Sequence, residues 1–260
     1  TGDSELILEC FAKYGRESFS WLNGMFAIAI WDNQENTLTL ARDHVGIKPV
    51  YYFADGKEFL FASELKGITA VKKGMPLNQL AIPAFLHLGY IPHPYSIYEP
   101  VRKLGAGSWA VIRLKDDGSL QYEEQKFWQI QDHIASQTLT DEASAKQQLS
   151  DLLFDSVAGQ LLSDVPIGTF LSGGTDSSIV TAIAAKVSSG PINTYSIAVT
   201  DGKINEAPYA AKVAQHLKTD HHELPITQKE ILDMVPGFIG VYDEPFSDSS
   251  AFPTMLVSKL

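Results

Sequence analysis

The sequence is poor in cysteine, with Cys10 alone among its 260 residues. A single cysteine excludes a disulfide within the chain and favours a reducing compartment, so we expect a cytoplasmic protein. No apolar run is long enough to cross a membrane, and no signal peptide opens the chain. Lysine and arginine number 20 against 31 aspartates and glutamates, and no basic cluster interrupts this acidic balance. Neither nucleic acid nor a membrane is therefore an expected partner.

The remaining composition is that of an ordinary globular protein, with 45% hydrophobic and 20% charged residues. The length predicts one or two domains with sizeable cores. The chain opens with Thr1 rather than Met, and it closes at Leu260 inside a predicted helix. We therefore expect a piece of a longer protein, shortened at both ends.

The most informative stretch is the string SGGTDSS at 172–178. It follows an apolar run at 165–171, which predicts a short buried strand, and it precedes an apolar helix at 179–187. A turn that opens a helix presents backbone N–H groups to an anion, and Gly173 and Gly174 let the backbone approach a ligand closely. The string has neither the G-K-[ST] ending of a Walker A loop nor the G-x-G-x-x-G spacing.

Asp176 is the unexpected member of this string, because a carboxylate repels a phosphate unless a cation lies between them. Mg²⁺ held by one carboxylate and by phosphate oxygens would explain it. Alternatively, Asp176 and Ser177 are simple helix caps. The whole string resembles the PP-loop of ATP pyrophosphatases, which bind the pyrophosphate released when a substrate is adenylated. That resemblance implies ATP and Mg²⁺ as cofactors.

Two different patterns divide the chain. Up to about residue 130, helices alternate with antiparallel hairpins, at 24–42, 50–62 and 109–122. From about residue 138, a helix is followed by strand, helix, strand, helix and strand, which is typical of a parallel sheet. The polar stretch at 129–140 is the predicted linker. Ligands bind beyond the carboxyl ends of parallel strands, which groups the loop at 172–178, the residues after Val199 and the acidic string at 243–248.

Three strings in the first half carry a further resemblance: TGDSE at 1–5, LNGMFA at 22–27 and ARDHVGIKPVYY at 41–52. Together they resemble the glutaminase domain of glutamine-dependent asparagine synthetases, and with the SGGTDSS loop behind them the likeness covers essentially the whole chain. The family implies an incomplete α+β sandwich of the N-terminal-nucleophile-hydrolase type at 1–130. It implies an incomplete α/β PP-loop domain with a parallel sheet at 138–260.

The same resemblance implies roles for individual residues. Asp3 matches the aspartate that holds the α-ammonium group of glutamine, and Asp176 matches the Mg²⁺ ligand. The catalytic N-terminal cysteine of the family is not in this sequence, and Cys10 cannot replace it because it lies in a predicted helix without a free amine. Nor does the sequence reach the lysines and general base of the synthetase half. The implied ATP and pyrophosphate site comprises Leu171, Ser172, Gly173, Gly174, Asp176, Ser177, Ser178 and Val199.

Each of these assignments has a structural alternative. Asp3 could cap the first helix, and Val199 could be a core residue at a strand end. Glu206 could be an acid in the first turn of a helix or match an acidic residue of the family. Three further pairs are interpreted as structural: Arg42 and Asp43 as an ion pair that fixes a turn, His221 and His222 on opposite faces of a strand, and Asp248 or Ser249 as a helix cap.

For the intact protein, the resemblance implies a glutamine-hydrolysing asparagine synthase. Aspartate would be adenylated on its side-chain carboxylate by ATP, and ammonia from glutamine would displace AMP, so glutamine and aspartate are the implied substrates. A related amidotransferase acting on another carboxylate, in a polysaccharide or peptide-product pathway, is one alternative. A non-catalytic binding or regulatory relative is another. A homodimer and the identity of the acceptor remain open.

Overall fold

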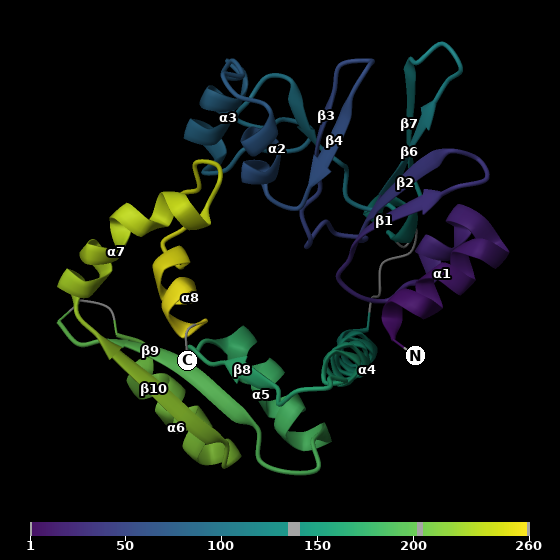
Figure 1. Cartoon of the computed structure of the whole chain (residues 1–260). Helices are drawn as coiled ribbons and strands as arrows, with labels where there is room; N and C mark the ends of the chain where they lie inside the picture. The colour runs from purple at the N-terminus through teal and green to yellow at the C-terminus, as the bar shows by residue number, and fades with distance from the viewer. Residues whose placement is uncertain (1, 135–140, 202–204, 259–260) are drawn as a thin grey trace. The chain divides into compact units, whose positions relative to one another are not determined.

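The computed structural model describes residues 2–134, 141–201 and 205–258 (Figure 1). The chain forms two compact units. Unit 1 comprises Thr1–Ala135 together with Ile239–Ser247, and unit 2 comprises Ser136–Phe238 together with Asp248–Leu260. Of the predicted linker, residues 135–140 lie outside the described residues, and the preceding stretch forms the short 3₁₀ helix η2 (Ile130–His133).

Unit 1 contains a four-stranded antiparallel sheet in the order β1-β2-β6-β7, from β1 (Ala27–Asp32), β2 (Thr37–Arg42), β6 (Ser108–Leu114) and β7 (Leu120–Lys126). Its central strands alternate between two cores. Ala41 and Trp109 pack on one face with Phe19 of η1 (Gly15–Trp21), where helix α1 (Asp3–Tyr14) also packs. Leu40 and Ala110 face the other core. The predicted hairpins at 24–42 and 109–122 are confirmed.

A second sheet of unit 1 has the order β4-β3-β5, from β3 (Tyr51–Ala54), β4 (Phe59–Ala62) and β5 (Val101–Lys103). Helix α2 (Leu65–Val71) packs on it through Leu65 and Ile68, against Phe53 and Val101. Helix α3 (Ala81–Leu88) contains Pro83 in its first turn, where no intrahelical hydrogen bond from its nitrogen is needed. At that position a proline does not interrupt the helix.

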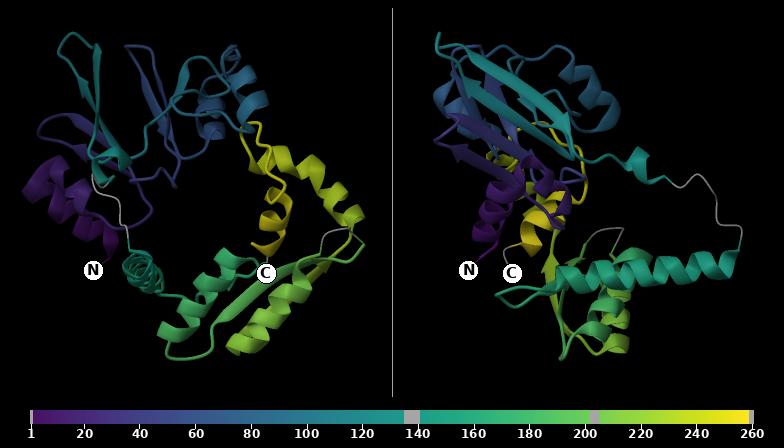
Figure 2. Two further views of the ribbon diagram at one scale, coloured as in Figure 1. Left: turned by 180° about the vertical axis from the view of Figure 1, so that it is seen from behind. Right: turned by 90° about the vertical axis from the view of Figure 1, so that its right-hand side faces the viewer.

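Unit 2 contains a parallel sheet in the order β10-β9-β8, from β8 (Gly168–Phe170), β9 (Asn193–Val199) and β10 (Asp220–Ile226). Helices α5 (Thr175–Val187) and α6 (Ala207–Leu217) connect successive strands, and α8 (Ala251–Val257) contacts β9. Helix α4 (Glu142–Gln160) precedes the sheet as one long helix (Figure 2) and packs on α5. Asp141 caps α4 by accepting the backbone N–H of Ser144 at 2.8 Å.

The predicted buried strand at 165–171 is wrong in extent and in burial. The strand comprises only Gly168–Phe170, and the Phe170 side chain is 58% exposed. Within the described residues β8 is an edge strand, so the apolar run before it does not lie between two strands. Leu171, at 2% exposure, is the residue of this run that enters the core. None of the described helices is both long enough and apolar enough to span a membrane.

Candidate functional site

The SGGTDSS loop joins the carboxyl end of β8 to the first turn of α5, as the sequence predicts. The Leu171 N–H donates to the carbonyl of Tyr195 at 2.8 Å, which extends the strand ladder by one residue. Gly174 then occupies the N-cap position of α5 in extended backbone geometry. The first N–H groups of a helix have no partner within it, so this turn presents donors and the positive end of the helix dipole to an anion.

Gly173 has a left-handed backbone, with φ of +81°. A Cβ at this position would lie 2.5 Å from the Cβ of Tyr209 and 2.6 Å from the backbone nitrogen of Ala210, both in α6. Ala210 is fully buried against Leu171. The glycine is therefore required first by the close packing of α6, a reason that the sequence did not reveal, and not only by the approach of a ligand.

The serines of the loop form a local network. Ser172 Oγ and Ser177 Oγ lie 2.9 Å apart, and Ser177 Oγ donates to the Gly174 carbonyl at 3.2 Å. The Gly174 N–H donates to Ser172 Oγ at 3.2 Å. Ser178 is different: among the described residues, its Oγ is the buried side-chain oxygen with no hydrogen-bond partner. An orphaned hydroxyl in the first turn of the helix is consistent with a site completed by a ligand.

Asp176 is exposed in the first turn of α5, beside these serines. The described part of the chain holds no cluster of three or more His, Cys, Asp or Glu side chains that could bind a metal ion by themselves. One carboxylate could hold Mg²⁺ only together with oxygens of a bound phosphate, which is the way Mg²⁺ usually binds. The exposed carboxylate, the orphaned Ser178 hydroxyl and the helix N-terminus therefore fit a magnesium-bound phosphate group.

Because β8 and β9 run in the same direction, Val199 at the carboxyl end of β9 lies at the same end of the sheet as this loop. Val199 ends β9 half-buried, and the following Thr200 N–H donates to Ile226 of β10 at 2.9 Å. Glu206 occupies the N-cap position of α6 with no side-chain cap bond. One interpretation had placed Glu206 within the first turn of that helix, but it lies one residue before the helix begins.

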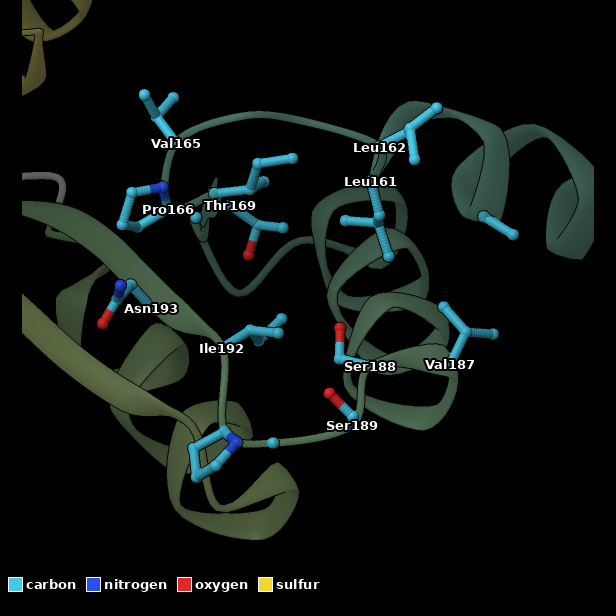
Figure 3. Close-up of a pocket in the computed structure, with 15 residues that line it drawn as sticks. Leu161, Leu162, Val165, Pro166, Thr169, Val187, Ser188, Ser189, Ile192 and Asn193 are labelled. Carbon is cyan, nitrogen blue, oxygen red and sulfur yellow. The ribbon is translucent and has the colours of Figure 1, made fainter.

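A cavity of about 570 Å³ lies at the opposite end of the same sheet (Figure 3). Gly168 and Asn193, at the amino ends of β8 and β9, line it together with Leu161, Val187 and other residues that carry no charge. A triphosphate needs cationic partners to balance its charge, and the lining of this cavity holds no charged side chain. Although this cavity is large enough for a small ligand, its uncharged lining does not fit the triphosphate of a nucleotide.

In unit 1, Asp3 is the first residue of α1, and Gly2 occupies the N-cap position without a side-chain cap bond. The alternative interpretation of Asp3 as the helix cap is therefore wrong, and its carboxylate is exposed. Cys10 lies within α1, as predicted, and is half-buried rather than part of a core.

Arg42 and Asp43 fix the following turn, but not by pairing with each other. The Arg42 guanidinium donates to the carbonyls of Gly46, Lys48 and Leu104 at 2.7, 2.8 and 2.7 Å. The fully buried Asp43 carboxylate accepts the N–H groups of Ile47 and Lys48 at 2.8 and 2.9 Å. Burial lowers the pKa of Arg42, partly offset by the nearby Asp43. The predicted structural role holds, while the predicted ion pair is replaced by bonds to the backbone.

The acidic string at 243–248, which the sequence placed beside the nucleotide loop, is divided between the units. Its residues 243–247 belong to unit 1, where Glu244 pairs with Lys103 at 2.6 Å. Asp248 belongs to unit 2 and accepts the N–H and hydroxyl of Ser250, both at 2.8 Å. Ser250 is the N-cap residue of α8, so the predicted cap at Asp248 or Ser249 is displaced along the chain.

His221 and His222 lie on opposite faces of β10, as expected. The His221 ring contacts the hydroxyls of Thr194 and Ser196 at 2.9 and 3.3 Å. The His222 ring stacks on Tyr195, with centroids 5.1 Å apart. Both histidines therefore have structural partners on β9, which agrees with their predicted structural role.

The comparisons with known proteins agree on both halves of the chain. The family model described as a glutamine amidotransferase domain matches residues 1–128, and the one described as asparagine synthase matches residues 148–260. A Methanocaldococcus jannaschii protein, provisionally named as glutamine-hydrolysing asparagine synthetase 2, is 37% identical over 99% of this chain and 50% of its own length. Glutamine-hydrolysing asparagine synthetase 1 of Bacillus subtilis is 30% identical over 99% of this chain and 39% of its own length.

Asparagine synthetase B of Escherichia coli is also 30% identical, over 91% of this chain and 39% of its own length. The chain thus spans half or less of the length of these relatives. Both halves nevertheless match in the order that the sequence strings and the two units follow. The chain belongs to the glutamine-dependent asparagine synthetase family, with a glutamine amidotransferase part followed by an asparagine synthase part.

Proposed function

We propose that the protein is a glutamine-hydrolysing asparagine synthase, a carbon–nitrogen ligase that uses glutamine as its nitrogen donor. The observation that carries the proposal is the SGGTDSS turn at the carboxyl end of β8, with its orphaned Ser178 hydroxyl and exposed Asp176. Residues 1–130 are the proposed glutaminase domain, of the N-terminal-nucleophile-hydrolase type, and residues 138–260 the proposed ATP-binding domain. The single cysteine favours the cytoplasm as its location.

In the synthetase half, the N–H groups at the start of α5 and the hydroxyls of Ser172, Ser177 and Ser178 would bind the pyrophosphate part of ATP. Asp176 would hold Mg²⁺, which neutralises phosphate charge when it is bound. The backbones of Leu171 and Val199 would line the nucleotide site. This arrangement supports attack of the aspartate side-chain carboxylate on the α-phosphorus of ATP, which gives β-aspartyl-AMP and pyrophosphate. Ammonia then displaces AMP and forms the amide.

In the glutaminase half, the exposed Asp3 carboxylate would bind the α-ammonium group of glutamine. The turn held by Arg42 and Asp43 has a structural role in this proposal, because every contact of the two side chains given above is to backbone. Ammonia released there has to remain unprotonated to act as a nucleophile, which favours an internal route over release into water near pH 7.

The test is Asp176→Ala in the full-length protein that carries this sequence. We expect loss of aspartate-dependent exchange between ATP and pyrophosphate, while glutamine hydrolysis persists, because Asp176 is assigned to the synthetase half alone. Asp155→Ala, a change on α4 away from the loop, is the control and should retain exchange. Exchange that is unchanged in the Asp176 variant would contradict the assignment.

A related amidotransferase that acts on another carboxylate remains the second candidate, because none of the described contacts identifies the acceptor. A panel of carboxylates, with AMP formation as the readout, separates the two functions. AMP formed with aspartate alone supports the asparagine synthase. AMP formed only with a different carboxylate would instead assign the protein to the related amidotransferases.

A further inference from the structure

The second half of the chain supplies a segment to the first unit. Residues 148–260 match the asparagine synthase model, yet Ile239–Ser247 belongs to the compact unit formed by Thr1–Ala135. Helix α7 (Gln228–Val241) follows β10 and ends within this segment, and α8 begins shortly after it. We call Ile239–Ser247 the inserted segment.

A buried ion pair holds the centre of the inserted segment. Glu244 Oε2 lies 2.6 Å from Lys103 Nζ, and the two side chains are only 10% and 14% exposed. The other carboxylate oxygen accepts the backbone N–H of Ile97 at 2.8 Å, and the Tyr51 hydroxyl lies 3.2 Å from Oε2. Lys103 Nζ also donates to the Ile91 carbonyl at 2.6 Å. Both charges are thus paired and hydrogen-bonded, which a buried pair requires.

Contacts on either side of Glu244 reinforce this pair. Asp243 accepts the backbone N–H of Lys66 at 3.0 Å, and Lys66 Nζ donates to the Gly240 carbonyl at 3.1 Å. The Ser247 N–H donates to the carbonyl of Gly89, the C-cap residue of α3, at 2.8 Å. The inserted segment is therefore fixed along its length to α2, α3 and β5, with the buried pair at its centre.

Both flanks of the inserted segment lead into the sheet of unit 2. On one side α7 directly follows β10, and on the other side α8 contacts β9, the strand that ends at Val199. A shift of the segment against the rest of unit 1 would therefore be carried along the chain to the elements around the proposed nucleotide site. The segment provides a covalent, two-sided link between the two proposed activities.

We propose that the inserted segment couples glutamine hydrolysis to amide synthesis, with Lys103 as the positioning residue that holds it. The proposal rests on the proposed function, because coupling requires both activities. Lys103 belongs to the amidotransferase part and is remote in sequence from the SGGTDSS loop. Removing its charge should therefore disturb the link without removing a group that contacts ATP or aspartate.

The experiment compares Lys103→Met with wild type in the full-length protein that carries this sequence. With glutamine as donor, we expect the glutamate released per asparagine formed to rise about three- to tenfold. With ammonia as donor, the asparagine rate should stay within about twofold of wild type. The control is Lys72→Met, which removes the partner of Glu58 in unit 1 without touching the inserted segment.

Amide hydrogen exchange on the same variants tests, independently of activity, whether Lys103 holds the inserted segment in place. The amides of Ile97 and Ser247 should exchange about tenfold faster or more in Lys103→Met, and should not change in Lys72→Met. Unchanged exchange in Lys103→Met would overturn the anchoring role. Faster exchange with an unchanged product ratio, or an equal fall of the glutamine- and ammonia-driven rates, would overturn the coupling. If wild type forms asparagine from neither donor, the proposed function fails. The amide hydrogen-exchange result still decides whether Lys103 holds the inserted segment.

Discussion

Arg42 and Asp43 are adjacent in sequence and bind the same turn, Arg42 through the carbonyl groups of the turn and Asp43 through the N–H groups of the turn. Arg42 donates to the carbonyls of Gly46 and Lys48, while Asp43 accepts the N–H groups of Ile47 and Lys48. Lys48 therefore has its carbonyl bound by one side chain and its N–H bound by the other. The two residues act as a template for a turn that would otherwise bury unpaired backbone groups.

Asp43→Asn should destabilise unit 1 by about 2 kcal/mol, because an amide cannot accept two N–H groups with both of its ends. Urea unfolding measures this, and Asp55→Asn is the matched control. Asp55 also accepts two backbone N–H groups, from Lys57 and Glu58, but it accepts both on Oδ1, which an asparagine amide oxygen can replace, and it lies in an exposed hairpin turn. We expect a smaller loss there, and equal losses at the two sites would contradict the template role.

Gly173→Ala should be among the most damaging single changes in unit 2. The new Cβ would meet α6 at 2.5–2.6 Å, on a backbone with φ of +81°. We expect a loss of about 3 kcal/mol or more, seen as a lower midpoint of thermal unfolding. Gly174→Ala is the neighbouring control, since its Cβ would lie 3.3 Å from the small Ser172 Oγ at an ordinary φ of −70°. Similar losses for both glycines would refute the packing argument.

Ser178→Ala and Ser177→Ala should separate stability from ligand binding. The Ser178 hydroxyl has no partner among the described residues, so its removal should leave the free protein unchanged or stabilise it by up to about 1 kcal/mol. Ser177→Ala removes the bonds to Ser172 and Gly174 and should cost about 1 kcal/mol. Calorimetry with Mg·ATP should show weaker binding for Ser178→Ala. Undiminished affinity there would remove Ser178 from the proposed site.

Tyr122 should make unit 1 sensitive to alkali. Burial, reinforced by the hydrogen bond to Glu124 at 2.6 Å, raises the pKa of Tyr122 above its ordinary value. A tyrosine with a raised folded-state pKa stabilises the fold fully below about pH 10, and this contribution is lost as the pH rises further. The free energy of unfolding of wild type should therefore fall more steeply above pH 10 than that of Tyr122→Phe. Tyr90→Phe, at a half-exposed tyrosine, should retain the steep fall.

Local patterns predicted most of the elements and the loop at 172–178. Hairpins with alternating apolar residues, and a strand followed by glycines and a helix, are determined by nearby residues, so a single sequence reveals them. The burial of 165–171 was not predictable in this way, because it depends on whether β8 has a neighbour on each side. The membership of Glu244 in unit 1 depends on Lys103, which lies far away along the chain. Lys103 ends β5, a three-residue strand that was not among the predicted elements, so no sequence signal indicated the pairing.

The position of the inserted segment affects how this protein can be dissected. A cut within residues 135–140 would not release two complete bodies, because the downstream piece would carry away Glu244 and leave the Lys103 ammonium without its counter-ion. An isolated amidotransferase half with Ile239–Ser247 grafted onto its end would retain that counter-ion. Fragments chosen from family boundaries alone would instead leave each half with exposed surfaces that the intact chain covers.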